Sequence, residues 1–208
     1  MNKLPEPWWS TYAETKEAIR TRLEEFSNVP AGQYFYELAF CILTPQSSAV
    51  NAEKTILELE RDSFFFNGFD PTPYLRDPKH YIRFHNTKAK RLLAARESFQ
   101  ELAHHLMDTT LAAEAAREIV LAKINGLGMK EASHFLRNIG VRNLAILDRH
   151  IFKHLKRLGV IKDIPKSVTK KRYLEIEKKG HKYANKIGIP LDELDLLFWS
   201  METGEIRK

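Results

Sequence analysis

Apolar residues recur at helical spacing along most of this chain, and runs that alternate with the period of a β-strand are nearly absent. Glycines stand where helices would end, with Gly140 after a segment predicted at about residues 129–139 and Gly159 after one at about 149–158. The proline-rich stretch from residue 69 to residue 86 is the only long segment expected to be irregular. The pattern therefore predicts an all-α protein.

The sequence predicts nine helices, with Ser10 or Thr11 as the cap of the first and Asn86-Thr87 as the cap of the fourth. They cover about residues 11–26, 31–43, 46–59, 87–105, 111–124, 129–139, 149–158, 169–187 and 191–201. We expect two interleaved helical subdomains. Residues 31–145 would form one, with a helix–hairpin–helix motif at about 114–140 in its binding cleft, and residues 1–30 with 146–208 would form the other.

Charge and cysteine content narrow the function. The 208 residues carry a formal net charge of +6, which favours a polyanionic partner such as nucleic acid. The single cysteine, Cys41, excludes an intrachain disulfide framework, a four-cysteine zinc site and a four-cysteine iron–sulfur cluster. No stretch has the apolar length of a membrane span, and the N-terminus has no apolar signal core. We therefore expect an intracellular protein of the cytoplasm or nucleoid.

Two glycines, Gly126 and Gly128, stand within three residues between two predicted helices. Glycine lets a backbone lie close to a phosphate, and the free N–H groups that start the next helix, from Met129 onward, would point at that anion. A plain turn between two helices also uses glycine, so the two glycines alone do not distinguish a phosphate-binding hairpin from such a turn. Lys130 follows the second glycine by two residues, and Asp148 lies 18 residues further on, where it would open a helix.

With these residues the chain resembles the helix–hairpin–helix DNA glycosylase superfamily. The segment from Gly128 to Gly140, followed by Ala145-Ile146-Leu147-Asp148-Arg149-His150, is similar to the archaeal-type 8-oxoguanine DNA glycosylase/lyases in particular. The resemblance implies a bifunctional enzyme of base-excision repair. Lys130 would attack the sugar as an amine nucleophile, form a Schiff base and cleave the strand on the 3′ side by β-elimination. Asp148 would cap its helix and stabilise the positive sugar of the transition state.

Four further residues are candidates for the base pocket or the gap that a flipped base leaves. Gln46 follows Thr44-Pro45, which would otherwise simply begin a helix. Phe84 precedes a basic helix, where an aromatic ring could stack on a base or pack in the core. Trp199 lies off the apolar stripe of the last helix, on the same face as Asp192 and Asp195. The resemblance adds Lys208, the final residue.

The resemblance implies double-stranded DNA containing 8-oxoguanine as the substrate, and we expect a monomer with no metal, no iron–sulfur cluster and no membrane partner. A monovalent cation at the hairpin is compatible with the family. Two alternatives stay open. A non-catalytic helix–hairpin–helix module would keep the glycines and need neither Lys130 nor Asp148, and an endonuclease-III-like glycosylase without a cluster would act on oxidised pyrimidines.

Overall fold

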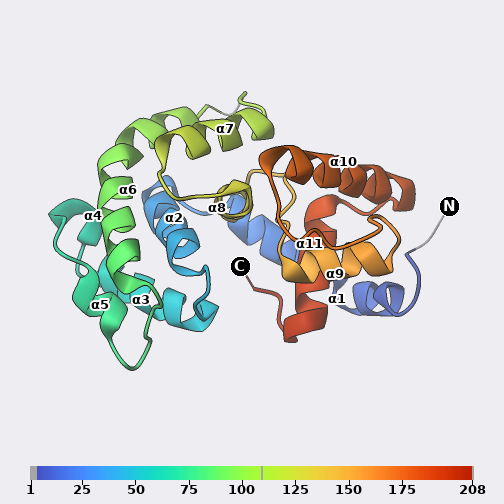
Figure 1. Cartoon of the computed structure of the whole chain (residues 1–208), viewed down its shortest axis with the longest axis horizontal. Helices are drawn as coiled ribbons and strands as arrows, with labels where there is room; N and C mark the ends of the chain where they lie inside the picture. Colours follow the sequence, from blue (N-terminus) through green and yellow to red (C-terminus); the bar gives the residue numbers. More distant parts are fainter. Residues whose placement is uncertain (1–3, 109, 208) are drawn as a thin grey trace. The chain divides into compact units, whose positions relative to one another are not determined.

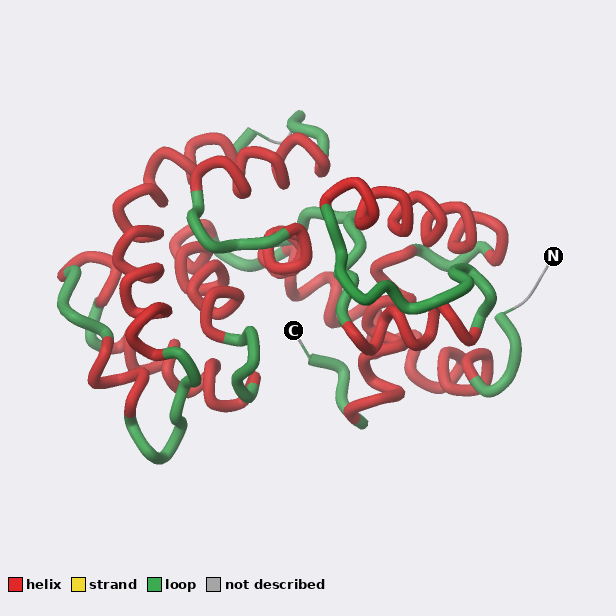
Figure 2. Tube along the Cα trace, viewed as in Figure 1, coloured by secondary structure: helices red, strands yellow, loops and turns green. Residues whose placement is uncertain are grey.

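A computed structural model describes residues 4–108 and 110–207, and this part of the chain is built of helices joined by loops, with no strand (Figures 1 and 2). The all-α prediction is confirmed. The contacts of the chain divide it into two compact units, which are residues 29–135 and residues 1–28 with 136–208. The sequence placed these boundaries after residues 30 and 145. In the structure they follow Asn28 and Phe135.

The unit of residues 29–135 is organised around one apolar helix. Its elements are η1 (Ala31–Gln33), α2 (Tyr34–Leu43), α3 (Ala49–Arg61), α4 (Phe64–Asn67), α5 (Thr72–Arg76), α6 (His85–Leu106), α7 (Ala113–Lys123) and the start of α8 (Met129–Asn138). Every residue of α2 after Tyr34 is buried, and α2 packs against α3 and α6. A helix that is apolar on all sides belongs in the centre of a core, where it holds the more amphipathic helices around it.

The unit of residues 1–28 and 136–208 is organised around the C-terminal helix α11. Its helices are α1 (Trp8–Ser27), α9 (Arg149–Arg157), α10 (Lys170–Ile187) and α11 (Leu191–Thr203), preceded by the end of α8. Helix α11 packs against α1, α9 and α10, so the N-terminal helix and the C-terminal helix share one core. None of the described helices is both long and apolar enough to cross a bilayer.

Several predicted helix starts are wrong. Helix α1 begins at Trp8, so Ser10 and Thr11 lie inside it and do not cap it. Helix α3 begins at Ala49 after Ser48; Thr44 instead follows the end of α2, and its carbonyl accepts a turn hydrogen bond from the Ser47 N–H at 2.9 Å. Neither helix has a side-chain hydrogen bond at its N-cap, so the tertiary context and not a capping side chain sets these two starts.

The proline-rich stretch is less irregular than predicted, because it contains α5. Pro73 lies in the first turn of α5, where a missing N–H has no helical acceptor to lose. Helix α6 begins at His85, with Phe84 at the N-cap position, so Asn86 and Thr87 lie inside the helix. The short helix α4, which the sequence did not predict, precedes this stretch.

Candidate active site

The hairpin joins α7 to α8 within the unit of residues 29–135. Ile124 is buried where α7 ends, and Gly126 follows with a φ of +86°, a left-handed conformation that glycine adopts readily. A Cβ atom on Gly126 would lie 2.7 Å from Cζ of Arg91, so the guanidinium of α6 packs directly on the bare glycine. Gly128 is exposed. The hairpin therefore exposes the backbone of both glycines just before α8.

Helix α8 is held to α7 by a buried polar contact. Arg117 of α7 is almost fully buried, and its Nη1 donates to Oγ of Ser133 at 3.0 Å. Removing the acceptor would take one hydrogen bond from a buried guanidinium, which is destabilising. The start of α8, with Met129 and Lys130, is thereby fixed relative to the end of α7.

Lys130 lies in the first turn of α8, and its side chain is 27% exposed. Its Nζ is 3.9 Å from Oε1 of Glu131, an ion-pair separation beyond hydrogen-bonding distance. The amine is thus partly sheltered and still accessible. It lies beside the backbone N–H groups that begin α8.

Asp148 is the N-cap of α9, as predicted. Its Oδ1 accepts hydrogen bonds from the backbone N–H of His150 at 2.8 Å and of Ile151 at 2.9 Å. Its Oδ2 has no partner among the described residues. The residues before it are buried, and the hydroxyl of Tyr173 accepts the N–H of Leu147 at 3.2 Å. The backbone thus aims one carboxylate oxygen into the helix and leaves the other available.

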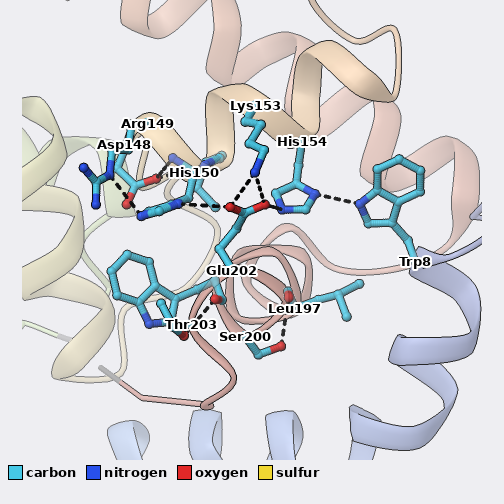
Figure 3. Close-up of polar contacts among 12 residues, drawn as sticks. Trp8, Asp148, Arg149, His150, Lys153, His154, Leu197, Ser200, Glu202 and Thr203 are labelled. Carbon is cyan, nitrogen blue, oxygen red and sulfur yellow. Dashed lines mark hydrogen bonds and ion pairs between the residues drawn. The ribbon is translucent and has the colours of Figure 1, made fainter.

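A second carboxylate, Glu202 at the end of α11, binds the same helix (Figure 3). Lys153 donates to both of its oxygens, at 2.7 and 2.6 Å, and lowers the pKa of Glu202. Nε2 of His154 lies 3.2 Å from its Oε1, and Nδ1 of His150 lies 3.6 Å from its Oε2. Glu202 therefore fixes the helix that begins at Asp148.

The ring of His154 is held as one neutral tautomer. Its Nδ1 accepts a hydrogen bond from the indole Nε1–H of Trp8 at 2.7 Å (Figure 3). Since indole can only donate, the ring proton of neutral His154 sits on Nε2 and points at Glu202. Burial lowers the pKa of His154, an effect that Glu202 partly opposes. These side-chain contacts, from Trp8 through His154 to Glu202, join α1, α9 and α11.

Trp199 is half-buried, and its ring meets that of His150 edge-on at 5.2 Å. The face that it shares with acids is not a solvated one. Asp192 is 2% exposed and accepts the backbone N–H of Asn143 with both oxygens, at 3.2 and 3.1 Å. The carboxylate of Asp195 accepts from Nη1 of Arg137 at 3.2 Å. Both acids on the face of Trp199 therefore bind other parts of the same unit. Lys208 lies outside the described residues.

Gln46 and Phe84 both belong to the unit of residues 29–135, and both are exposed. Each has a positive φ, +57° for Gln46 and +59° for Phe84, which is uncommon for a residue with a side chain. The predicted site residues are thus divided between the units. Lys130, the hairpin, Gln46 and Phe84 lie in one, and Asp148 and Trp199 in the other.

The chain matches one family of known proteins over most of its length. Residues 19–189 match the family model described as 8-oxoguanine DNA glycosylase. The chain belongs to this family. The 8-oxoguanine DNA glycosylase/AP lyase of Fusobacterium nucleatum is 41% identical over 206 residues, which cover 95% of this chain and 94% of that protein.

Two solved structures extend the match to three dimensions. The Methanocaldococcus jannaschii 8-oxoguanine glycosylase/lyase, in complex with a 15mer DNA containing 8-oxoguanine, superposes with a TM-score of 0.83 at 32% identity and covers 96% of this chain and 98% of its own. The 8-oxoguanine DNA glycosylase of Thermotoga maritima gives 0.84 at 32% identity, over 97% and 96% of the two chains. A TM-score above 0.8 over nearly the full length of both chains means that the whole 8-oxoguanine DNA glycosylase fold is present.

The sequence did not single out two residues that have several polar partners in the structure. Lys88 was part of a basic segment and reads as a solvated lysine, but it is 3% exposed. Glu202 carries no motif and gains its partners only from folding. Among the described residues, no three His, Cys, Asp or Glu side chains are placed to hold a metal ion.

Proposed function

We propose that this protein excises 8-oxoguanine from double-stranded DNA and then cleaves the strand at the abasic site. The observation that carries this proposal is the match to the family over residues 19–189, with an accessible lysine, Lys130, at the start of the helix after the glycine hairpin. A DNA-binding module without catalysis has no need of a half-sheltered amine at that position.

Lys130 supplies the nucleophile. The lone pair of its neutral Nζ attacks C1′ of the deoxyribose, and the C1′–N9 bond breaks with its electron pair leaving on the base, which takes up a proton. Loss of the amine protons and opening of the sugar ring give a Schiff base between Nζ and C1′. Removal of a proton from C2′ then breaks the C3′–O bond, and the 3′ phosphate leaves.

Asp148 supplies the fixed negative charge. Its Oδ1 is occupied by the two N–H groups of α9, which hold the carboxylate in one orientation. The remaining oxygen can face the developing positive charge of the sugar and accept protons released from the amine. Cap and catalyst are therefore compatible roles of one side chain.

The hairpin would bind the DNA backbone. We propose that the exposed N–H groups at Gly128 and the start of α8 bind a phosphate. We also propose that the hairpin can bind a monovalent cation. The chemistry above uses the side chains of the chain itself and requires no metal. We expect the protein to bind its duplex as a monomer and to work where genomic DNA is held, in the cytoplasm or nucleoid.

Borohydride trapping on a duplex with one 8-oxoguanine tests the proposal. Reduction converts the Schiff base into a stable protein–DNA crosslink, which the wild-type protein should give and Lys130→Gln should not. Lys123→Gln is the matched control, because Lys123 ends the preceding helix and pairs with Glu101; it should still crosslink. A Lys130→Gln protein that is trapped as well as the wild type would move the nucleophile elsewhere. Trapping on oxidised-pyrimidine duplexes alone would favour the endonuclease-III-like alternative.

A further inference from the structure

Lys88 is a buried lysine that the proposed chemistry does not use. It lies in the first turn of α6, and its side chain ends against the loop of residues 44–48 that follows α2. A lysine is almost never buried without partners, because removing its charge from water is costly. Its contacts should therefore show what it does.

The three N–H donors of the Lys88 ammonium have three acceptors. Two of them belong to the loop of residues 44–48, and the third belongs to the last residue of α2. Nζ donates to the carbonyl of Leu43 at 2.6 Å, to the carbonyl of Pro45 at 2.7 Å and to Oγ of Ser47 at 3.0 Å. An ammonium has three N–H groups, so every donor is used. Two of these acceptors, Pro45 and Ser47, are the direct sequence neighbours of Gln46 on either side.

The hydrogen bonds of Ser47 also bind a second segment, the turn before α6. Oγ of Ser47 also accepts the backbone N–H of Arg83 at 3.0 Å, and Arg83 is the neighbour of Phe84. Nδ2 of Asn51 adds another link by donating to the carbonyl of Tyr81 at 3.2 Å. The loop that carries Gln46 and the turn that carries Phe84 are thus bound to each other through Ser47 and Lys88.

Gln46 and Phe84 both have a backbone conformation that is unfavourable for residues with a side chain. Gln46 and Phe84 have φ angles of +57° and +59°, in the left-handed region where a side chain crowds its own backbone. Such residues persist where surrounding bonds over-determine them, and they gather at sites of function. Here the surrounding bonds are those of Lys88 and Ser47.

The surroundings of the Lys88 ammonium disfavour its positive charge. Burial, and after it the nearby positive charges of Arg91 and Arg83, lower the pKa of Lys88 to about 8. The carbonyls oppose this effect, because they accept hydrogen bonds best from the charged form. Near neutral pH the group is still mainly protonated and can donate all three bonds.

We propose that Lys88 is a positioning residue of the DNA-binding surface, whose buried ammonium sets the 44–48 loop and the turn at Arg83-Phe84 so that Gln46 and Phe84 are presented to the duplex. This inference rests on the proposed function, because it assigns Gln46 and Phe84 to the base pocket or to the gap left by the flipped base. Lys88 touches neither the substrate nor the reacting atoms, and it acts through the two segments that it binds.

The test is a double-mutant cycle on single-turnover excision of 8-oxoguanine. Lys88→Met keeps the shape of the side chain and removes the three donors, and it should lower excision about tenfold, the scale of losing buried hydrogen bonds. In a protein that already carries Gln46→Ala and Phe84→Ala, the same change should lower excision less than about twofold, because contacts that act through shared partners are not additive. A purely structural role would give the same loss in both backgrounds, which would overturn the inference.

Two further variants keep the test decisive. Lys54→Met is the matched control, because Lys54 is an exposed lysine of α3 in the same unit; it removes the same charge and should leave excision unchanged. If Lys88→Met fails to fold, Ser47→Ala replaces it, since it deletes the acceptor shared by Lys88 and Arg83 while leaving the charge in place. It should show the same non-additivity with Gln46→Ala and Phe84→Ala.

The outcomes also separate this inference from the proposed function. Normal excision by the protein with Gln46→Ala and Phe84→Ala would overturn the role of Lys88 and leave the role of Lys130 standing. Absence of both excision and trapping in the wild-type protein would remove the proposed function, and with it this inference.

Discussion

Asp148 offers a clean separation of a structural role from a chemical one. The structure shows that its Oδ1 caps α9 by accepting two backbone N–H groups, at 2.8 and 2.9 Å. Asp148→Asn keeps an oxygen in the capping position and removes the charge. Asp148→Ala removes both. The two variants should therefore behave alike in catalysis and differently in stability.

The magnitudes follow from the geometry. Loss of a capping side chain to alanine costs about 1 kcal/mol of unfolding free energy, which for a chain of this size lowers the melting temperature by roughly 2–4 °C. Asparagine is as good a cap as aspartate, so Asp148→Asn should melt close to the wild type. Loss of the preorganised charge should lower base excision by about 10²-fold in both variants.

Thermal melting and single-turnover excision on the same protein samples provide the assay. Thr169→Ala is the matched control, because Thr169 caps α10 in the same unit and its Oγ1 accepts the N–H of Arg172 at 3.3 Å. It should lower the melting temperature as Asp148→Ala does and leave excision unchanged. Excision by Asp148→Asn at a rate near that of the wild type would refute the catalytic role and leave the cap alone.

Three further predictions concern binding, pH and the C-terminus. Gly128→Val places its Cβ near the mobile carboxylate of Glu131, so it should fold and yet bind lesion and undamaged duplexes more weakly to the same extent in gel-shift titrations; a loss confined to lesion DNA would contradict the phosphate role. Because burial lowers the pKa of His154, the stability that the neutral ring supplies is complete above about pH 6.5 and declines below it. Melting temperatures of His154→Gln should therefore fall less than those of the wild type between about pH 7 and pH 5.5, and equal slopes would count against this. Removing residues 206–208 should leave melting nearly unchanged and reduce excision of 8-oxoguanine more than cleavage of pre-formed abasic sites; equal losses on the two substrates would exclude the tail from the base pocket.

The local sequence determined those features whose causes are local. Helical spacing of apolar residues and scarce strand patterning predicted an all-α chain, which the structure confirms. The cap at Asp148 was predictable because an N-cap bond joins residues two and three positions apart. Gly126 and Gly140 were readable for the same reason, since a positive φ is a property of one residue and its neighbours.

Tertiary structure decided everything that depends on partners distant in sequence. Lys88 resembles any surface lysine in the sequence, and it is buried because the loop after α2 brings three acceptors to it from more than 40 residues away. The sequence placed Asp192 on the face of α11 that lies off the apolar stripe, yet its carboxylate is buried and accepts the backbone N–H of Asn143. Whether a charged side chain is exposed or buried depends on which acceptors and donors the fold places around it, and helical periodicity contains no information about those partners.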